Sequence, residues 1–90
     1  MTDRVLALHP SRPTTTRLRR DRYTAARRAI LDAVRTHGPL TLDALVEAAS
    51  DRLDPGLGSL HWYVRTVKLD LEARGVLARD RSRPHRVRLA

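Results

Sequence analysis

The residues of this 90-residue chain that could do chemistry are mostly arginines, and they gather at its two ends. Residues 1–22 hold six arginines against two aspartates, and residues 76–90 hold five arginines against one aspartate. Between them, residues 23–75 hold seven basic and seven acidic groups, so the formal net charge of +8 is divided between the two ends. A balanced centre between two basic ends is typical of a folded body with extensions that bind phosphate, although two solvated tails are the simpler alternative.

Residues that could support catalysis or bind a metal do not form a recognisable set. His9, His37, His61 and His85 never stand three or four positions apart, and the chain has no cysteine. A metal site needs a histidine pair at helical spacing or a set of thiolates. No serine lies in a G-x-S-x-G sequence, which is the setting of an activated nucleophile. We therefore expect no enzyme activity, no metal and no cofactor.

Helices are expected to position the basic residues. Apolar residues three and four positions apart predict one buried face of a first helix: Tyr23, Ala26, Ile30 and Val34. The start of this helix is open, because Thr16 and Asp21 are both suitable N-caps. Gly38 and Pro39 end it, since glycine accepts a positive φ and proline cannot continue a helix.

Two further helices follow. Thr41 is the expected N-cap of a short second helix, and Leu40 can pack against Leu45 across that cap. This helix ends between residues 49 and 52, and a turn with two glycines and one proline covers residues 53–58. Ser59 caps a third helix that runs to about Arg74. Its apolar stripe repeats at intervals of four, three and four: Leu60, Val64, Val67 and Leu71.

The hydrophobic period changes to two after Gly75. Residues 76–79 and 85–89 are predicted strands of a hairpin, with a loop over residues 80–84. Val87 and Leu89 should face the core, and Arg86 and Arg88 should face outward. Residues 1–15 show no period, so we expect an arm or loop with a possible short strand at Val5–Leu8.

Residues 24–89 resemble the winged helix-turn-helix family of bacterial and phage regulators. The resemblance lies in the sequence Gly-Pro-Leu-Thr-Leu-Asp-Ala-Leu at 38–45 and in Leu-Glu-Ala-Arg-Gly-Val-Leu at 71–77. It implies a mainly α fold, with three helices and a small β-hairpin as the wing. The corresponding division is a basic arm over residues 1–15 and a winged helix-turn-helix domain over residues 16–90. The turn at 50–58 is longer than is common in this family.

The resemblance implies double-stranded DNA as the partner, with the third helix in the major groove and the wing on the minor groove and backbone. A helical projection places His61, Arg65 and Lys68 together on one flank of that helix, where Arg65 suits a guanine and Lys68 a phosphate. A solvated flank without a ligand is the alternative. The full set of expected DNA contacts is Ser59, His61, Trp62, Arg65, Thr66, Lys68, Arg79, Arg81, Arg83, Arg86, Arg17, Arg19 and Arg20.

Trp62 and Leu69 lie seven positions apart, opposite the core stripe of the third helix. Two large apolar side chains on one outer face call for a cover. The N-terminal segment with Val5, Leu6 and Leu8, a second copy of the chain in a homodimer, and DNA itself are three candidates.

The sequence thus predicts a sequence-specific DNA-binding protein, most simply a transcriptional repressor. A winged-helix module that binds another protein, or an accessory DNA factor in replication or recombination, is the alternative function. No stretch is long and apolar enough to cross a membrane, so we expect a cytoplasmic protein associated with the nucleoid.

Overall fold

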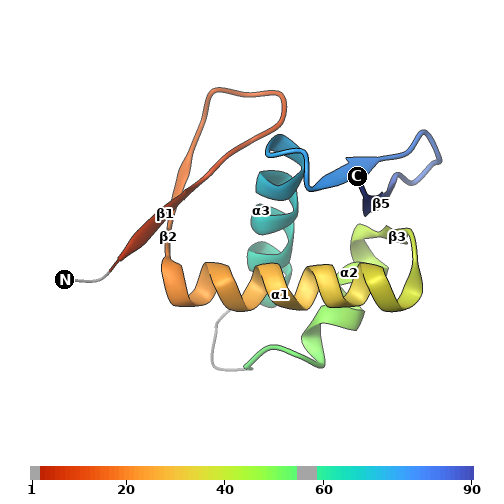
Figure 1. Cartoon of the computed structure of the whole chain (residues 1–90), viewed down its shortest axis with the longest axis horizontal. Coiled ribbons are helices and arrows are strands. Elements are labelled where there is room, and N and C mark those ends of the chain that lie inside the picture. Colours follow the sequence, from red (N-terminus) through yellow and green to blue (C-terminus); the bar gives the residue numbers. More distant parts are fainter. Residues whose placement is uncertain (1–2, 55–58) are drawn as a thin grey trace.

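A computed structural model describes residues 3–54 and 59–90, which form three helices and two small antiparallel sheets (Figure 1). The molecule is flat, with principal extents of 41 × 31 × 18 Å. The elements along the chain are β1 (Arg4–Ala7), β2 (Thr16–Arg19), α1 (Arg20–His37), β3 (Leu40–Thr41), α2 (Leu42–Ser50), α3 (Leu60–Ala73), β4 (Leu77–Arg79) and β5 (Arg86–Leu89).

The helix caps form where the sequence predicts them. Gly38 has a φ of +78°, and its N–H donates to the carbonyl oxygen of Val34 at 2.8 Å. The Thr41 and Ser59 hydroxyl oxygens each accept a backbone N–H three residues later, at 3.3 Å, and so cap α2 and α3. The bounds of α2 and α3 therefore agree with the prediction. Of the turn expected over residues 53–58, positions 55–58 lie outside the described residues.

The start of α1 differs from both expected N-caps. Residues 16–19 form strand β2, and the helix begins at Arg20 with Arg19 as an N-cap that makes no side-chain capping bond. The reason is that β2 pairs with β1, from Arg4 opposite Arg19 to Ala7 opposite Thr16. Backbone groups that are committed to a strand ladder cannot begin a helix.

The N-terminal residues form a hairpin instead of an arm. Strand β1 begins and ends one residue before the segment expected at 5–8. Ala7 and Leu18 are buried in the core, and Val5 packs against it. We call β1, β2 and the residues between them the N-terminal hairpin (4–19).

The second sheet has the order β3-β5-β4, so the predicted hairpin of β4 and β5 is present and carries an additional strand. Strand β3 escapes prediction because it is two residues long, yet its pairing with Val87 and Arg86 fastens the hairpin to the start of α2. Val87 is buried as expected, whereas Leu89 is 39% exposed. Leu89 lies at the end of the ladder, where less of the core is left to cover it. We call residues 77–89 the C-terminal hairpin.

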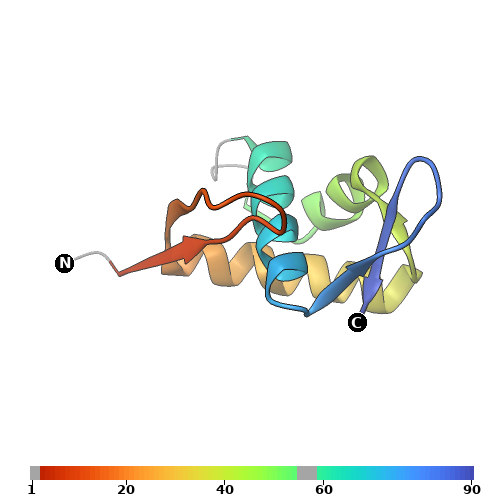
Figure 2. The same ribbon diagram turned by 90° about the horizontal axis from the view of Figure 1, so that it is seen from above.

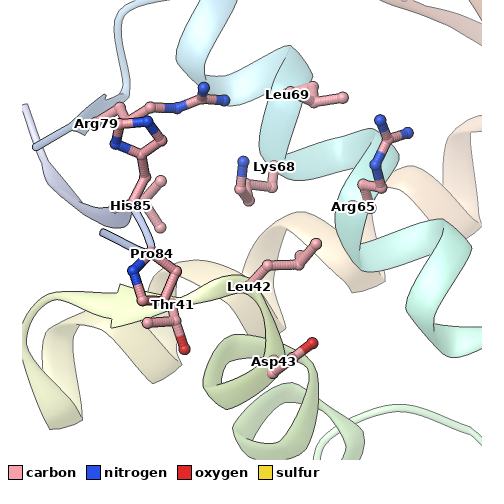
Figure 3. A pocket seen from close by; sticks show the side chains of 10 residues that line it. Thr41, Leu42, Asp43, Arg65, Lys68, Leu69, Arg79, Pro84 and His85 are labelled. Carbon is pink, nitrogen blue, oxygen red and sulfur yellow. The ribbon is translucent and has the colours of Figure 1, made fainter. Parts of the chain in front are cut away.

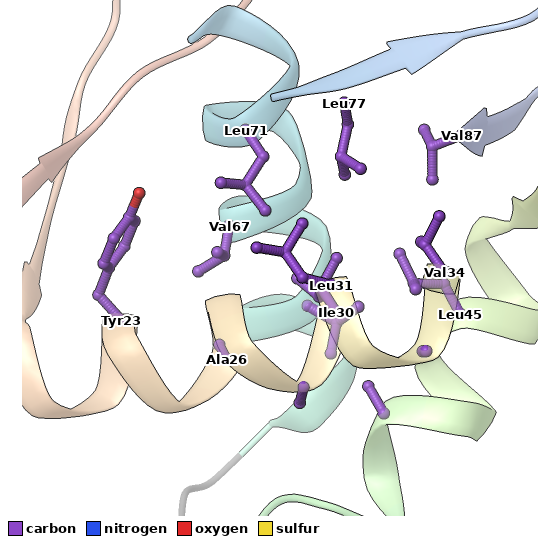
Figure 4. Packing of buried hydrophobic residues seen from close by; sticks show 14 of the residues in the cluster. Tyr23, Ala26, Ile30, Leu31, Val34, Leu45, Val67, Leu71, Leu77 and Val87 are labelled. Atoms are coloured by element: carbon purple, nitrogen blue, oxygen red, sulfur yellow. The ribbon is translucent and has the colours of Figure 1, made fainter. Parts of the chain in front are cut away.

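An aliphatic core holds the three helices together (Figure 4). The predicted faces of α1 and α3 both point into it, with Leu60 only partly buried. Ile30, Leu45 and Leu71 are fully buried, and burying each such side chain stabilises the fold by about 1.5–3 kcal/mol. In two perpendicular views the two hairpins lie on opposite sides of α3 (Figures 1 and 2). The fold therefore presents α3 between two β-hairpins.

Candidate nucleic-acid interface

The N-terminal half of α3 is the exposed part of this helix. Ser59, His61, Trp62 and Arg65 are exposed, and Thr66 is partly buried. All five belong to the DNA contacts expected from the sequence, and all five keep accessible surface. Ser59 accepts one N–H group at the start of α3, and the other N–H groups of this first turn have no partner within the helix.

Arg65 lies at the centre of this surface. It borders three neighbouring hollows, two of which are lined by the loop after β1 and two by the C-terminal hairpin. No acidic side chain of residues 3–54 and 59–90 forms an ion pair with it. Arg65 therefore carries an accessible, uncompensated positive charge between the two hairpins.

One of these hollows, which we call the α2–α3 hollow, has a volume of about 320 Å³ and lies between the start of α2, α3 and the C-terminal hairpin. Figure 3 shows Lys68 between Arg65 on one side and Arg79 on the other. The residues that line the α2–α3 hollow are Thr41, Leu42, Asp43, Arg65, Lys68, Leu69, Arg79, Pro84, His85 and Val87.

Lys68 is not the free phosphate contact that its helical position suggests. It is 8% exposed, and its ammonium donates to Glu72 Oε2 at 2.9 Å. Glu72 also accepts Nε of Arg79 at 2.9 Å, so one buried carboxylate holds two of the expected contacts. The sequence analysis missed this pair, although Lys68 and Glu72 stand four positions apart on one helix, a spacing at which opposite charges meet. Arg79 keeps 43% of its side chain exposed.

The tip of the C-terminal hairpin is held by Asp80. Its Oδ1 accepts the backbone N–H groups of Ser82 and Arg86, each at 3.0 Å, and the Ser82 hydroxyl. The Ser82 hydroxyl and then the Arg86 N–H lower the pKa of Asp80 below its ordinary value, because both stabilise the carboxylate. Arg81, Arg83 and Arg86 are exposed, and none of them pairs with an acid in the described part of the chain.

The basic residues of the N-terminal hairpin are more compensated. Arg17 is exposed on β2. Arg19 donates to Asp21 at 3.0 Å, and Arg20 donates to Asp3. Arg17 and Arg19 are thus strand residues rather than part of a helix start, and the charges of Arg19 and Arg20 are shared with neighbouring carboxylates.

The outer face with Trp62 and Leu69 is only half open. Leu69 is 9% exposed, so this part of the outer face is covered, as the sequence analysis required. Two of the hollows that Leu69 borders are also lined by the loop after β1, which begins at Leu8. Leu8 belongs to the N-terminal segment that the sequence analysis gave as a candidate intrachain cover. Trp62 remains 43% exposed and meets the Tyr63 ring edge-on, with ring centroids 5.0 Å apart.

Asp70 is a structural residue that the sequence analysis missed. Its side chain is fully buried, and it accepts the Leu8 N–H at 2.9 Å, Arg74 Nε at 2.8 Å and the Tyr23 hydroxyl. Arg74 also donates to the Leu6 carbonyl oxygen at 3.0 Å. Asp70 and Arg74 therefore tie the end of β1 to α3. The available signal was an aspartate three positions after Val67, on the core face, with an arginine four positions later.

This cluster perturbs two of its members. Burial, and then the hydrogen bond to Asp70, raise the pKa of Tyr23 to about 12. The hydrogen bond to Asp70 raises the pKa of Arg74 above its ordinary value. Both shifts favour the protonated forms, which donate the hydrogen bonds of this cluster. Its members come from β1, α1 and α3.

The described residues contain no group of three or more His, Cys, Asp or Glu side chains that could hold a metal ion. Among the same residues, no helix has the length and apolar character that crossing a bilayer requires.

A family model described as a family of unknown function (DUF6958) matches residues 4–87, so the chain belongs to this family. The match includes the N-terminal hairpin, all three helices and the C-terminal hairpin as far as Val87. Comparison with curated proteins and with solved structures gave no match.

Proposed function

We propose that this chain is a winged helix-turn-helix domain that binds double-stranded DNA. The observation that carries the proposal is the position of Arg65, which is exposed, unpaired and flanked by two arginine-bearing hairpins. The order of elements supports it, because a strand between the first two helices pairs with the last strand of the hairpin that follows α3. The resemblance to winged helix-turn-helix regulators implies three helices followed by a hairpin, and the order α1, α2, α3, β4, β5 agrees with that part of it.

In the proposed complex the N-terminal half of α3 enters the major groove. This groove is wide enough for a helix and displays a distinct pattern of donors and acceptors for each base pair. The guanidinium of Arg65 can donate two parallel hydrogen bonds to a guanine. Ser59 and the free N–H groups of the first turn suit a backbone phosphate. His61, Trp62 and Thr66 border this contact.

The C-terminal hairpin supplies the second contact. Arg81 and Arg83 stand on a loop that Asp80 holds in place, so little conformational freedom is lost when they meet the minor groove or a phosphate. Arg86 lies at the base of this loop. Arg79 contributes through the exposed part of its side chain, and Lys68 contributes only indirectly, by sharing Glu72.

A regulator of transcription, most simply a repressor, is the cellular role that follows from site-specific binding. Binding as a homodimer to a symmetric site fits this role, and the exposed Trp62 is the surface that a second copy could use. The same exposed Trp62 supports the alternative of a protein-binding module. The salt dependence of binding separates the two, because phosphate contacts weaken steeply with salt and an apolar contact does not.

Selection of duplexes from a random pool, followed by titration of the selected duplex at several salt concentrations, tests the proposal. We expect a preferred sequence, and we expect Arg65→Ala to reduce discrimination against mismatched sites by about 1–3 kcal/mol. Arg35→Ala is the matched control, because Arg35 is an exposed arginine on α1 that pairs with Asp32 and borders none of the three hollows. Absence of any salt-sensitive duplex binding would refute the proposal, and equal losses on all sequences would reassign Arg65 to a phosphate.

A further inference from the structure

The α2–α3 hollow has the lining of a site for a small anion. Three cationic side chains border it, from Arg65, Lys68 and Arg79, against the carboxylate of Asp43 in the lining and that of Glu72, which pairs with Lys68 and Arg79. In Figure 3 the two guanidinium groups lie on opposite sides of the Lys68 ammonium. Cations on several sides of one space suit an anion with several acceptor oxygens, and phosphate has three that are free when its fourth is esterified.

The charges of this hollow are held in position. Glu72 fixes the Lys68 ammonium and Arg79 Nε at 2.9 Å each. Two cations on one carboxylate leave a net positive charge, and Lys68 is 8% exposed, so water screens it little. Arg65 adds a cation that no acid of the described residues pairs with. An anion here would meet donors whose orientation is already set.

The hollow is also larger and less polar than inorganic phosphate needs. Its volume of about 320 Å³ is at the lower end of the range of about 300–1,000 Å³ that small-molecule sites occupy. Leu42, Pro84 and Val87 line it beside the cations. These apolar walls can cover a ring or an aliphatic group attached to the phosphate.

We infer that the α2–α3 hollow binds a small organic phosphate, with the phosphate group held by Arg65 and Arg79 beside the Glu72-paired Lys68, and with the organic group against Leu42 and Pro84. The inference does not depend on duplex binding, although Arg65 belongs to both sites. A ligand of this size uses contacts from α2, α3 and the C-terminal hairpin at once.

Phenyl phosphate is a suitable probe, titrated into the isotope-labelled full chain without DNA and followed by amide and arginine Nε chemical shifts. We expect saturable shifts confined to residues that line the hollow. Phenol should not produce them, and inorganic phosphate should bind about tenfold more weakly because it buries no apolar surface. Shifts spread over both hairpins, equal shifts with phenol, equal affinity for inorganic phosphate, or no saturation would each overturn the inference.

Three single variants complete the test. Arg65→Ala and Arg79→Ala should each weaken phenyl phosphate binding about fivefold, the effect of losing one partly exposed charge-assisted contact. Arg88→Ala removes the same charge from an exposed position of β5 outside the hollow and should change binding less than about twofold. An equal loss in Arg88→Ala would reduce the effect to diffuse attraction and overturn the site. Because no duplex is present, failure here leaves the proposed DNA binding standing, and failure of duplex binding leaves this site standing.

Discussion

On one side of α3 the N-terminal hairpin is built into the core, while on the other side the C-terminal hairpin reaches past it. Ala7 and Leu18 of the first hairpin are buried in the core. Asp70 and Arg74 form hydrogen bonds with the backbone at the end of β1. The second hairpin is fastened by β3 and by two buried residues, Leu77 and Val87, and its tip is held only by its own bonds around Asp80.

The two basic ends also differ in how their charge is compensated. Arg19 and Arg20 pair with Asp21 and Asp3, and both pairs are exposed. In the C-terminal hairpin, only Arg79 pairs with an acid among the described residues, and Arg81, Arg83, Arg86 and Arg88 do not. Equal net charge in two stretches of sequence therefore does not mean equal capacity to bind phosphate.

This difference indicates a division of labour. The N-terminal hairpin covers Leu69 and closes one side of α3, so it limits how much of the helix is accessible. The C-terminal hairpin leaves Arg81, Arg83, Arg86 and Arg88 without an acidic partner among the described residues. We expect the first to contribute mainly to stability and the second mainly to binding.

The largest expected effect is that of Asp70→Asn on stability. The amide cannot satisfy Arg74, Tyr23 and the Leu8 N–H together, because one of its two ends is itself a donor. Breaking a buried, hydrogen-bonded charge cluster costs about 3 kcal/mol, and we expect that loss in the free energy of urea unfolding.

Asp80→Asn is the matched control for this variant, because Asp80 also accepts several hydrogen bonds but lies at the tip of the exposed hairpin. Its effect on unfolding should stay below about 1 kcal/mol. Equal destabilisation by the two variants would remove the distinction between an anchored and an extended hairpin.

The next largest effect concerns affinity for duplex DNA. Arg81→Ala combined with Arg83→Ala should weaken binding about tenfold and make it less sensitive to salt, because two uncompensated charges leave the interface. Arg19→Ala combined with Arg20→Ala removes two compensated charges and should weaken binding less than about threefold. Titration at matched ionic strength compares the two doubles, and a larger loss from Arg19 and Arg20 would reverse the assignment of roles.

Much of the helical framework could be predicted from the sequence because it depends on local chemistry. Thr41 and Ser59 cap helices through bonds that span three residues, and Gly38 takes a positive φ at the end of α1. The apolar faces of α1 and α3 follow from the helical period. Strands β2 and β3 were missed, since each depends on pairing with a segment nine or more positions away in the sequence.

The candidate site could be predicted only in part, for a similar reason. The exposure of Arg65 follows from its place on α3, one position after Val64 and therefore rotated away from the buried stripe. The burial of Leu69 does not, because it depends on a loop from the other end of the chain, and the bond of Glu72 to Arg79 does not, because Arg79 comes from the C-terminal hairpin. Side-chain partners that come from distant segments leave no periodic mark in the sequence.

The smallest expected effect is an alkaline loss of stability through Tyr23, and it tests whether the N-terminal hairpin depends on the buried cluster. Folding raises the pKa of Tyr23 from 10.0 to about 12. Below pH 10 the hydroxyl is neutral in both states and its bond to Asp70 is intact, whereas above pH 10 the unfolded chain ionises first, so this stability is lost between pH 10 and 12. At about pH 11 the loss should reach about 1 kcal/mol. Urea unfolding of the wild type and of Tyr23→Phe, each at about pH 8 and about pH 11, should therefore show their difference shrinking as pH rises. Parallel pH profiles would mean that Tyr23 is not tied to Asp70 in solution, and the contrast between the two hairpins would then depend on Arg74 and the apolar contacts alone.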